Sequence, residues 1–116
     1  GFEYHGPKGR IGFAPRLTPE NFKAPFTAAE GWGSLSQSRN GKTQINRIEV
    51  KWGGLRVKFL ALELPPGITL KTTTVATGTR QLAVKATQTG QRVELTLAKE
   101  LTLKANETIT TKLEFA

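Results

Sequence analysis

Few side chains in this sequence could perform catalysis or hold a metal ion. The chain has one histidine, His5, no cysteine and no aspartate, so that all nine acidic residues are glutamates. A hydrolase needs a nucleophile with its base, a pair of carboxylates or a metal centre, and the spacing of these residues indicates none of them. One histidine without thiolates is too few ligands for zinc, and calcium loops need clustered Asp and Asn oxygens. We therefore expect no enzymatic activity, no metal site and no cofactor.

The remaining chemistry suits binding. Seventeen Lys and Arg against nine Glu give a net charge of +8. This balance fits nucleic acid, an anionic membrane or an acidic glycan as a partner. An alternative explanation of the positive charge is that scattered Lys and Arg keep a β-rich surface soluble and prevent its edge strands from pairing with other chains. No apolar run approaches the roughly 20 residues of a membrane-spanning helix, so we expect no membrane partner.

Two dipeptides set the expected strand register around the two tryptophans. Asn40-Gly41 favours a two-residue type I′ turn, and Gly53-Gly54 is the second expected turn. Two-residue loops at both places predict a three-stranded antiparallel meander over residues 32–64. Side chains of such strands alternate between the two faces, so the turns determine which residues share a face.

The two faces of this meander differ in chemistry. The first is expected to form core and contains Gly33, Leu35, Asn46, Ile48, Val50, Trp52, Leu55, Val57 and Phe59. The second is expected to face water and contains Trp32, Ser34, Ser36, Ile45, Arg47, Glu49, Lys51, Arg56, Lys58 and Leu60. In this register Trp32 lies opposite Glu49 among serines and charges, whereas Trp52 points inward.

An exposed tryptophan among hydroxyl and charged groups is typical of a carbohydrate contact. The apolar face of a sugar ring stacks on the indole, while its hydroxyls hydrogen bond to the flanking polar groups. At about 25 cal/mol per Å² of buried apolar surface, one or two stacked rings together with a few hydrogen bonds support binding of roughly −4 to −8 kcal/mol, which is millimolar to micromolar. The candidate contact residues are Trp32, Ser34, Ser36, Arg47, Glu49 and Lys51, together with Tyr4 as a second platform and Trp52 despite its inward register.

Two other interpretations of this surface remain open. The N-terminal segment could cover Trp32, with Phe13, Phe22 or Phe26 lying over it. The basic residues beside Trp32 could instead form a single-strand nucleic-acid groove, although such platforms show several aromatic residues in series. No helix-turn-helix, zinc finger or aromatic-rich RNA-binding motif is visible, so nucleic acid is the less favoured partner.

The rest of the chain also reads as strands. They are expected at residues 2–4, 10–13, 68–76, 80–87, 92–98, 101–103 and 108–115. Thr18-Pro19-Glu20 has the features of a helix start, so we expect at most one short helical turn near residues 19–24. Strands about every ten residues, with turn signals between them, predict one all-β domain over residues 1–116. Its expected fold is an antiparallel β-sandwich of jelly-roll or immunoglobulin-like type.

Two runs in the first half of the chain resemble a known family. They are IGFAPRLTPENF at residues 11–22 and AAEGWG at residues 28–33. Both are similar to segments of the β-sandwich accessory domain in large bacterial glycoside hydrolases related to the family 116 β-glucosidases, and the similarity covers residues 1–64. The resemblance implies a non-catalytic module, covalently linked to a glycoside hydrolase catalytic domain in a secreted, extracellular or periplasmic bacterial enzyme.

The expected function is therefore non-catalytic carbohydrate binding. The expected ligands are plant-type β-glucans, namely cellulose, cello-oligosaccharides, mixed-linkage glucan or xyloglucan, to which the module would target an attached glycoside hydrolase. The first alternative is a structural accessory domain that braces a glycosidase catalytic domain without binding sugar. The second is a basic β domain that binds single-stranded nucleic acid.

Overall fold

The structure is a computed structural model that describes residues 2–5, 9–13, 21–28 and 30–116. Its elements are the strands β1 (Phe2–His5), β2 (Arg10–Phe13), β3 (Asn21–Ala28), β4 (Gly31–Asn40), β5 (Thr43–Glu63), β6 (Leu70–Thr77), β7 (Arg80–Leu82), β8 (Val84–Thr89), β9 (Arg92–Lys104) and β10 (Thr108–Phe115). No helix occurs in the described residues. The expected all-β class is confirmed.

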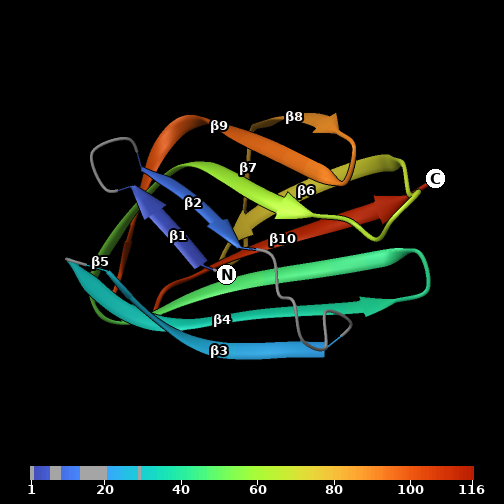
Figure 1. The fold of residues 1–116 in the computed structure, drawn as a ribbon. Coiled ribbons are helices and arrows are strands. Elements are labelled where there is room, and N and C mark those ends of the chain that lie inside the picture. The colour runs from blue at the N-terminus through green and yellow to red at the C-terminus, as the bar shows by residue number, and fades with distance from the viewer. Residues whose placement is uncertain (1, 6–8, 14–20, 29) are drawn as a thin grey trace.

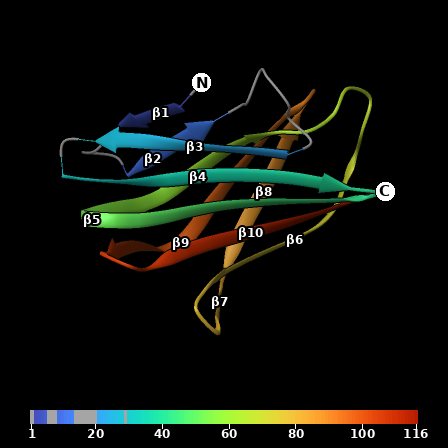
Figure 2. The same cartoon turned by 90° about the horizontal axis from the view of Figure 1, so that it is seen from below.

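The strands form a sandwich of two sheets that share β5 (Figure 1). The first sheet has the order β3-β4-β5-β10-β6-β7, and the second has the order β1-β2-β5-β9-β8. All neighbouring strands are antiparallel except β2 and β5, which are parallel. In Figure 2, β8 and β9 run steeply across the direction of β4 and β10, so the two layers cross at a large angle.

Aliphatic side chains fill the space between the sheets. The inward positions of β9 and β10 alternate with exposed ones, because side chains on a strand point to opposite faces in turn. The buried residues on these two strands include Val93, Leu95, Leu97, Leu103, Ile109, Leu113 and Phe115. The alternation predicted for residues 92–98 and 108–115 is confirmed.

The prediction of a second turn at Gly53-Gly54 was wrong. β5 continues as one strand of 21 residues through Gly53 and Gly54. Its first half pairs with β4 and its second half with β9, so the strand passes from one sheet into the other instead of reversing. Gly53 has φ +76°, and the Gly54 amide donates a hydrogen bond to the Glu30 carbonyl oxygen over 3.0 Å. Glycine supplies this positive φ at little cost, and here it bends a strand rather than closing a hairpin.

The first expected turn lies one residue later than predicted. Asn40 pairs with Thr43, so the two-residue loop is Gly41-Lys42 and not Asn40-Gly41. Ser34, and not Trp32, consequently lies opposite Glu49. The predicted facing of the residues up to Val50 is nevertheless correct. Because the turn lies one residue later, each residue of β4 pairs with a residue two positions further along β5, and a shift of two positions keeps side chains on the same face.

A bulge at Lys58 reverses the expected facing of the two residues that follow it. The amides of Lys58 and Phe59 both donate to the carbonyl oxygen of Gly9, over 2.7 and 3.1 Å. The extra residue resets the alternation, so that Leu60 is buried and Phe59 is half-buried on the outside. The guanidinium of Arg10 lies 5.1 Å from the centre of the Phe59 ring. The predictions of Phe59 as core and Leu60 as water-facing were wrong.

Other strand limits also differ from the predictions. Residues 21–24 belong to β3, so the helical turn expected near residues 19–24 was wrong for them, while residues 19 and 20 lie outside the described part. Pro25 is tolerated in β3 because β3 is an edge strand. The strand expected at residues 80–87 divides at Ala83 into β7 and β8, which belong to different sheets.

Three buried amide side chains close one end of the sandwich. Gln44 donates from Nε2 to Asn46 Oδ1 over 2.8 Å, and Asn46 donates from Nδ2 to Gln37 Oε1 over 2.6 Å. Arg39 donates from Nε to Gln44 Oε1 over 2.8 Å, and from Nη2 to the Glu63 carbonyl oxygen over 3.0 Å. Buried polar groups need such partners, so this network fixes how β4 meets both ends of β5.

Glu94 links the N-terminal hairpin to β9, and it predicts a pH dependence of stability. Its carboxylate accepts hydrogen bonds from Arg10 and from Arg92, each over 3.3 Å. The bond from Arg10 is the larger cause that holds the pKa of Glu94 below its ordinary value of 4.5. Because the pKa is lower in the folded state, the unfolded chain takes up the proton first. This contribution to stability is therefore full above the unfolded pKa and is lost as the pH falls through the folded one.

The free energy of unfolding should thus fall between about pH 5 and pH 3 more steeply in the native chain than in Glu94→Gln. Urea denaturation at a series of pH values measures the difference. Glu100→Gln is the matched control, because Glu100 is exposed and makes no ion pair with the described residues. Parallel pH profiles for the native chain and Glu94→Gln would contradict the prediction.

Candidate functional site

The register of four strands arranges outward side chains in rows. We call the solvent side of β3, β4, the first half of β5 and β10 the outer face. From one end, the first row is Thr27, Trp32 and Trp52; the second is Pro25, Ser34, Glu49 and Thr108; the third is Lys23, Ser36, Arg47 and Thr110. The outer face therefore carries an aromatic row, followed by a hydroxyl and carboxylate row, followed by a cationic row.

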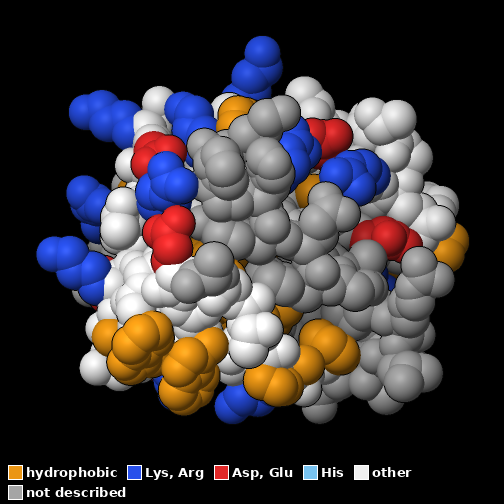
Figure 3. Space-filling view, turned by 60° about the vertical axis from the view of Figure 1, so that its left-hand side comes forward, with side chains coloured by type: hydrophobic (Ala, Val, Ile, Leu, Met, Phe, Trp, Pro, Cys, Tyr) orange, Lys and Arg blue, Asp and Glu red, His pale blue; other side chains and the backbone are white. Residues whose placement is uncertain are grey.

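The two tryptophans form a pair on this face. Trp32 is 49% exposed and Trp52 is 62% exposed, and they are directly opposite each other on β4 and β5. Directly paired side chains lie about 5 Å apart at Cβ, which places the indoles in one continuous surface. Figure 3 looks toward this end of the sandwich and shows exposed hydrophobic side chains beside a group of Lys and Arg side chains.

The outward position of Trp52 corrects the sequence prediction that it is core. Gly33 pairs with Val50 and Trp32 pairs with Trp52, so Lys51 is one residue in excess on β5. This bulge places Trp52 on the face opposite to the one that unbroken alternation from Val50 would give it. The expectation had assumed unbroken alternation up to a turn at Gly53.

Glycines next to Trp32 account for the bulge. A Cβ on Gly33 would overlap the carbonyl oxygen of Glu49 and lie 3.0 Å from Cε2 of Phe26. A Cβ on Gly31 would lie 2.6 Å from the carbonyl oxygen of Trp52. The β4 backbone therefore approaches β5 more closely than any side chain would allow. Glycines on both sides of a strand tryptophan are the sequence signal from which this bulge could have been found.

Phe22 and Phe26 do not cover Trp32. Phe26 pairs with Gly33 and Phe22 with Gln37, two inward positions, and Phe26 is buried in the core. The side chain of Phe13 lies outside the described part of the structure. The expectation that Trp32 faces solvent is confirmed by its exposure.

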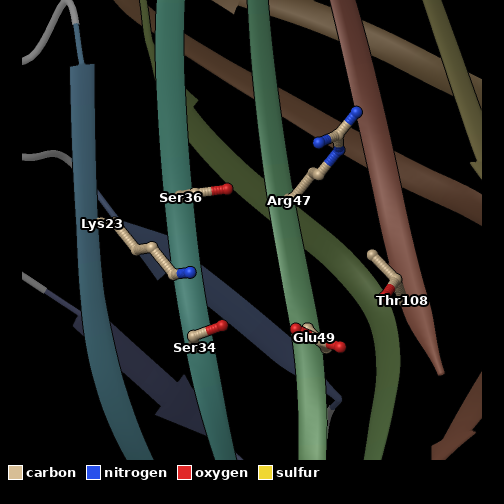
Figure 4. A pocket seen from close by; sticks show the side chains of 6 residues that line it. All are labelled: Lys23, Ser34, Ser36, Arg47, Glu49 and Thr108. Carbon is tan, nitrogen blue, oxygen red and sulfur yellow. The ribbon is translucent and has the colours of Figure 1, made fainter. Parts of the chain in front are cut away.

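A hollow of about 480 Å³ lies over the second and third rows of the outer face (Figure 4). It is lined by Lys23, Ser34, Ser36, Arg47, Glu49 and Thr108. In Figure 4 the Lys23 side chain extends from β3 across β4, and its ammonium group ends between Ser34 and Ser36. Four of the lining residues were candidates from the sequence.

Lys23 and Thr108 were missed. Residues 19–24 were expected to form a helical turn, and the position of β10 beside β5 depends on a pairing between residues about 60 positions apart. The structure does not add Tyr4 to these rows, because β1 belongs to the second sheet and the Tyr4 side chain is outside the described part.

Charges on the outer face are unevenly paired. Glu49 forms an ion pair with Lys51, whose Nζ lies 3.0 Å from Glu49 Oε1. Glu114 forms a second one with Lys112, whose Nζ lies 3.9 Å from Glu114 Oε1. Lys23 and Arg47 make no ion pair with any residue that the structure describes. The hollow therefore offers two cations without an ion pair to the described residues, three hydroxyl groups from Ser34, Ser36 and Thr108, and the Glu49 carboxylate paired with Lys51.

The described residues contain no group of three or more His, Asp or Glu side chains that could hold a metal ion. No helix long and apolar enough to cross a membrane is present among them either. Compared with known proteins, the chain matches no protein-family model and no curated protein.

Proposed function

We propose that this chain is a non-catalytic carbohydrate-binding module that takes a β-linked polysaccharide on its outer face. The observation that carries the proposal is the paired, exposed position of Trp32 and Trp52. Two neighbouring indoles present an apolar surface on which the apolar faces of sugar rings can stack. Exposing two such side chains together costs solubility, and a binding role explains why the fold keeps them outside.

The energetics agree with a module of modest affinity. A tryptophan covered on one side would bury about half of the 150–250 Å² typical of an aromatic side chain. At about 25 cal/mol per Å² this gives roughly 2 to 3 kcal/mol for each indole. Hydrogen bonds from sugar hydroxyls to Ser34, Ser36 and Glu49 add to this gain, while the loss of translational and rotational freedom opposes it. The balance lies in the micromolar to millimolar range.

The resemblance of residues 1–64 supports a place for this module beside a glycoside hydrolase. In this proposal the chain is one part of a secreted bacterial enzyme and holds the catalytic domain on cellulose, mixed-linkage glucan or xyloglucan. The rival proposal is that the tryptophan pair packs on the catalytic domain and only braces it. In that case the isolated chain would ignore soluble glycans.

Affinity electrophoresis tests the proposal against this rival. The chain is run through native gels that contain a cellulose derivative, xyloglucan, lichenan or xylan, and retardation by at least one glucan is expected. Unchanged mobility in every gel would overturn the binding proposal in favour of the brace.

A single-stranded nucleic acid is a second candidate ligand because Trp32 and Trp52 lie near the cations Lys23 and Arg47 on the outer face. Titration at low and high salt separates a nucleic acid from a neutral glucan. Nucleic-acid affinity falls steeply with salt because counterions are released, whereas binding to a neutral glycan changes little.

A further inference from the structure

The third row of the outer face is cationic on both sides of a serine. Lys23, Ser36 and Arg47 are register neighbours on β3, β4 and β5. Both cations are exposed, and neither pairs with a carboxylate of the described residues. In Figure 4 the Lys23 ammonium group lies over the hollow, whereas the Arg47 guanidinium reaches toward β10. An anion seated at this row would meet positive charge from two strands.

The cationic row is within reach of a glycan stacked on the tryptophans. Successive outward residues on one strand lie about 7 Å apart, so Ser36 is about 13 Å from Trp32 along β4. A polysaccharide that stacks on the indoles and continues along β4 and β5 would pass over Ser34 and Glu49 before reaching Lys23 and Arg47. The rows thus form a track with an apolar start and a positive end.

The middle of the track distinguishes a glycan from a nucleic acid. Glu49 is a carboxylate and accepts hydrogen bonds only, and Lys51 occupies one side of it at 3.0 Å. Sugar hydroxyls can donate to its remaining lone pairs. A DNA backbone of deoxyribose and phosphodiesters offers no such hydroxyl donors. The outer face therefore favours a ligand that is rich in hydroxyls and carries a carboxylate where it crosses the cationic row.

From this pattern we infer that the preferred ligand is an acidic β-linked polysaccharide, whose uronate carboxylate binds between Lys23 and Arg47 while neighbouring sugars stack on Trp32 and Trp52. This inference rests on the proposed function and specifies its ligand class. In this inference an acidic polysaccharide stacks on Trp32 and Trp52 in the same way as a neutral one.

Isothermal titration calorimetry with a matched pair of ligands tests the inference. The probes are a cello-oligosaccharide and the same oligosaccharide whose C6 groups are oxidised to carboxylates. An exposed ion pair typically changes an affinity by a factor of about 1.5 to 5, so two pairs predict a preference of roughly 2- to 30-fold for the oxidised form. The preference should shrink as salt is raised from about 0.02 to about 0.5 M, because the charges are solvent-exposed.

The Lys23→Gln, Arg47→Gln double variant should bring the ratio of the two dissociation constants close to one. The matched control is Lys85→Gln, Lys99→Gln, which removes the same charge from exposed positions on the second sheet and should keep the ratio. A neutral oligosaccharide that binds as tightly as the oxidised one would overturn the inference and leave the proposed function standing. Failure of both oligosaccharides to bind would overturn both.

Oligothymidylate is the third probe. Binding of oligothymidylate more tightly than the oxidised oligosaccharide, with loss of that binding in the double variant, would overturn the inference in favour of a nucleic-acid ligand. Weaker or undetectable binding of oligothymidylate supports it.

Discussion

Replacement of both Trp32 and Trp52 by alanine is expected to weaken β-glucan binding by at least about 100-fold, since each indole contributes roughly 2 to 3 kcal/mol of stacking by its buried area. Each single variant should lose about 30- to 150-fold, which is the affinity equivalent of about 2 to 3 kcal/mol. Titration calorimetry with a soluble glucan measures the loss, and complete loss of retardation in affinity gels would accompany it. The effect is large because the pair supplies most of the apolar contact that the outer face can offer.

The same double variant should remain folded. Trp32 and Trp52 are 49% and 62% exposed, so their truncation leaves no cavity in the core. Phe59→Ala is a matched control, since it removes a half-buried aromatic residue from the outside of the second sheet and should leave binding intact. A folded double variant that still binds the glucan like the native chain would move the site away from this pair.

Gly33→Ala is expected to destabilise the protein by about 3 to 5 kcal/mol, near the upper end for a single substitution. The added methyl would overlap the Glu49 carbonyl oxygen and approach the Phe26 ring to 3.0 Å. β4 and β5 would have to separate at the bulge, with loss of the ladder bonds on both sides. Urea denaturation followed by far-ultraviolet circular dichroism gives the free energy of unfolding.

Gly54→Ala is the control for the Gly33 prediction. A Cβ there would meet only the Leu103 carbonyl oxygen at 3.5 Å, an ordinary van der Waals contact, and we expect a change within about 1 kcal/mol. Equal effects of the two substitutions would show that the close approach of β4 to β5 at Gly33 is not the source of the cost. Since native proteins are stable by only about 5 to 15 kcal/mol, Gly33→Ala should also populate the unfolded state measurably.

Local patterns predicted the features of this protein that depend on neighbours in the sequence. The strand at residues 10–13, the hairpin near Gly41 and the alternation of β9 and β10 all follow from turn residues and period-two hydrophobicity. The outward position of Trp32, Ser34, Ser36, Arg47 and Glu49 follows from the same alternation. These features were correct because they require only that one face of a strand be buried.

Contacts between distant segments decided the rest. Whether Gly53 and Gly54 would reverse β5 or bend it depended on β9, which pairs with the second half of β5 from 29 to 50 residues away. The close approach of β4 at Gly33 placed an extra residue at Lys51 and turned Trp52 outward beside Trp32. The pairing of β3 and β10 with this sheet then brought Lys23 and Thr108 to the hollow. The sequence by itself determined the outward position of Trp32 and of the polar residues Ser34, Ser36, Arg47 and Glu49. Only the tertiary structure made a pair of the two tryptophans, because a single unpaired residue in a strand reverses the facing of the residues that come directly after it.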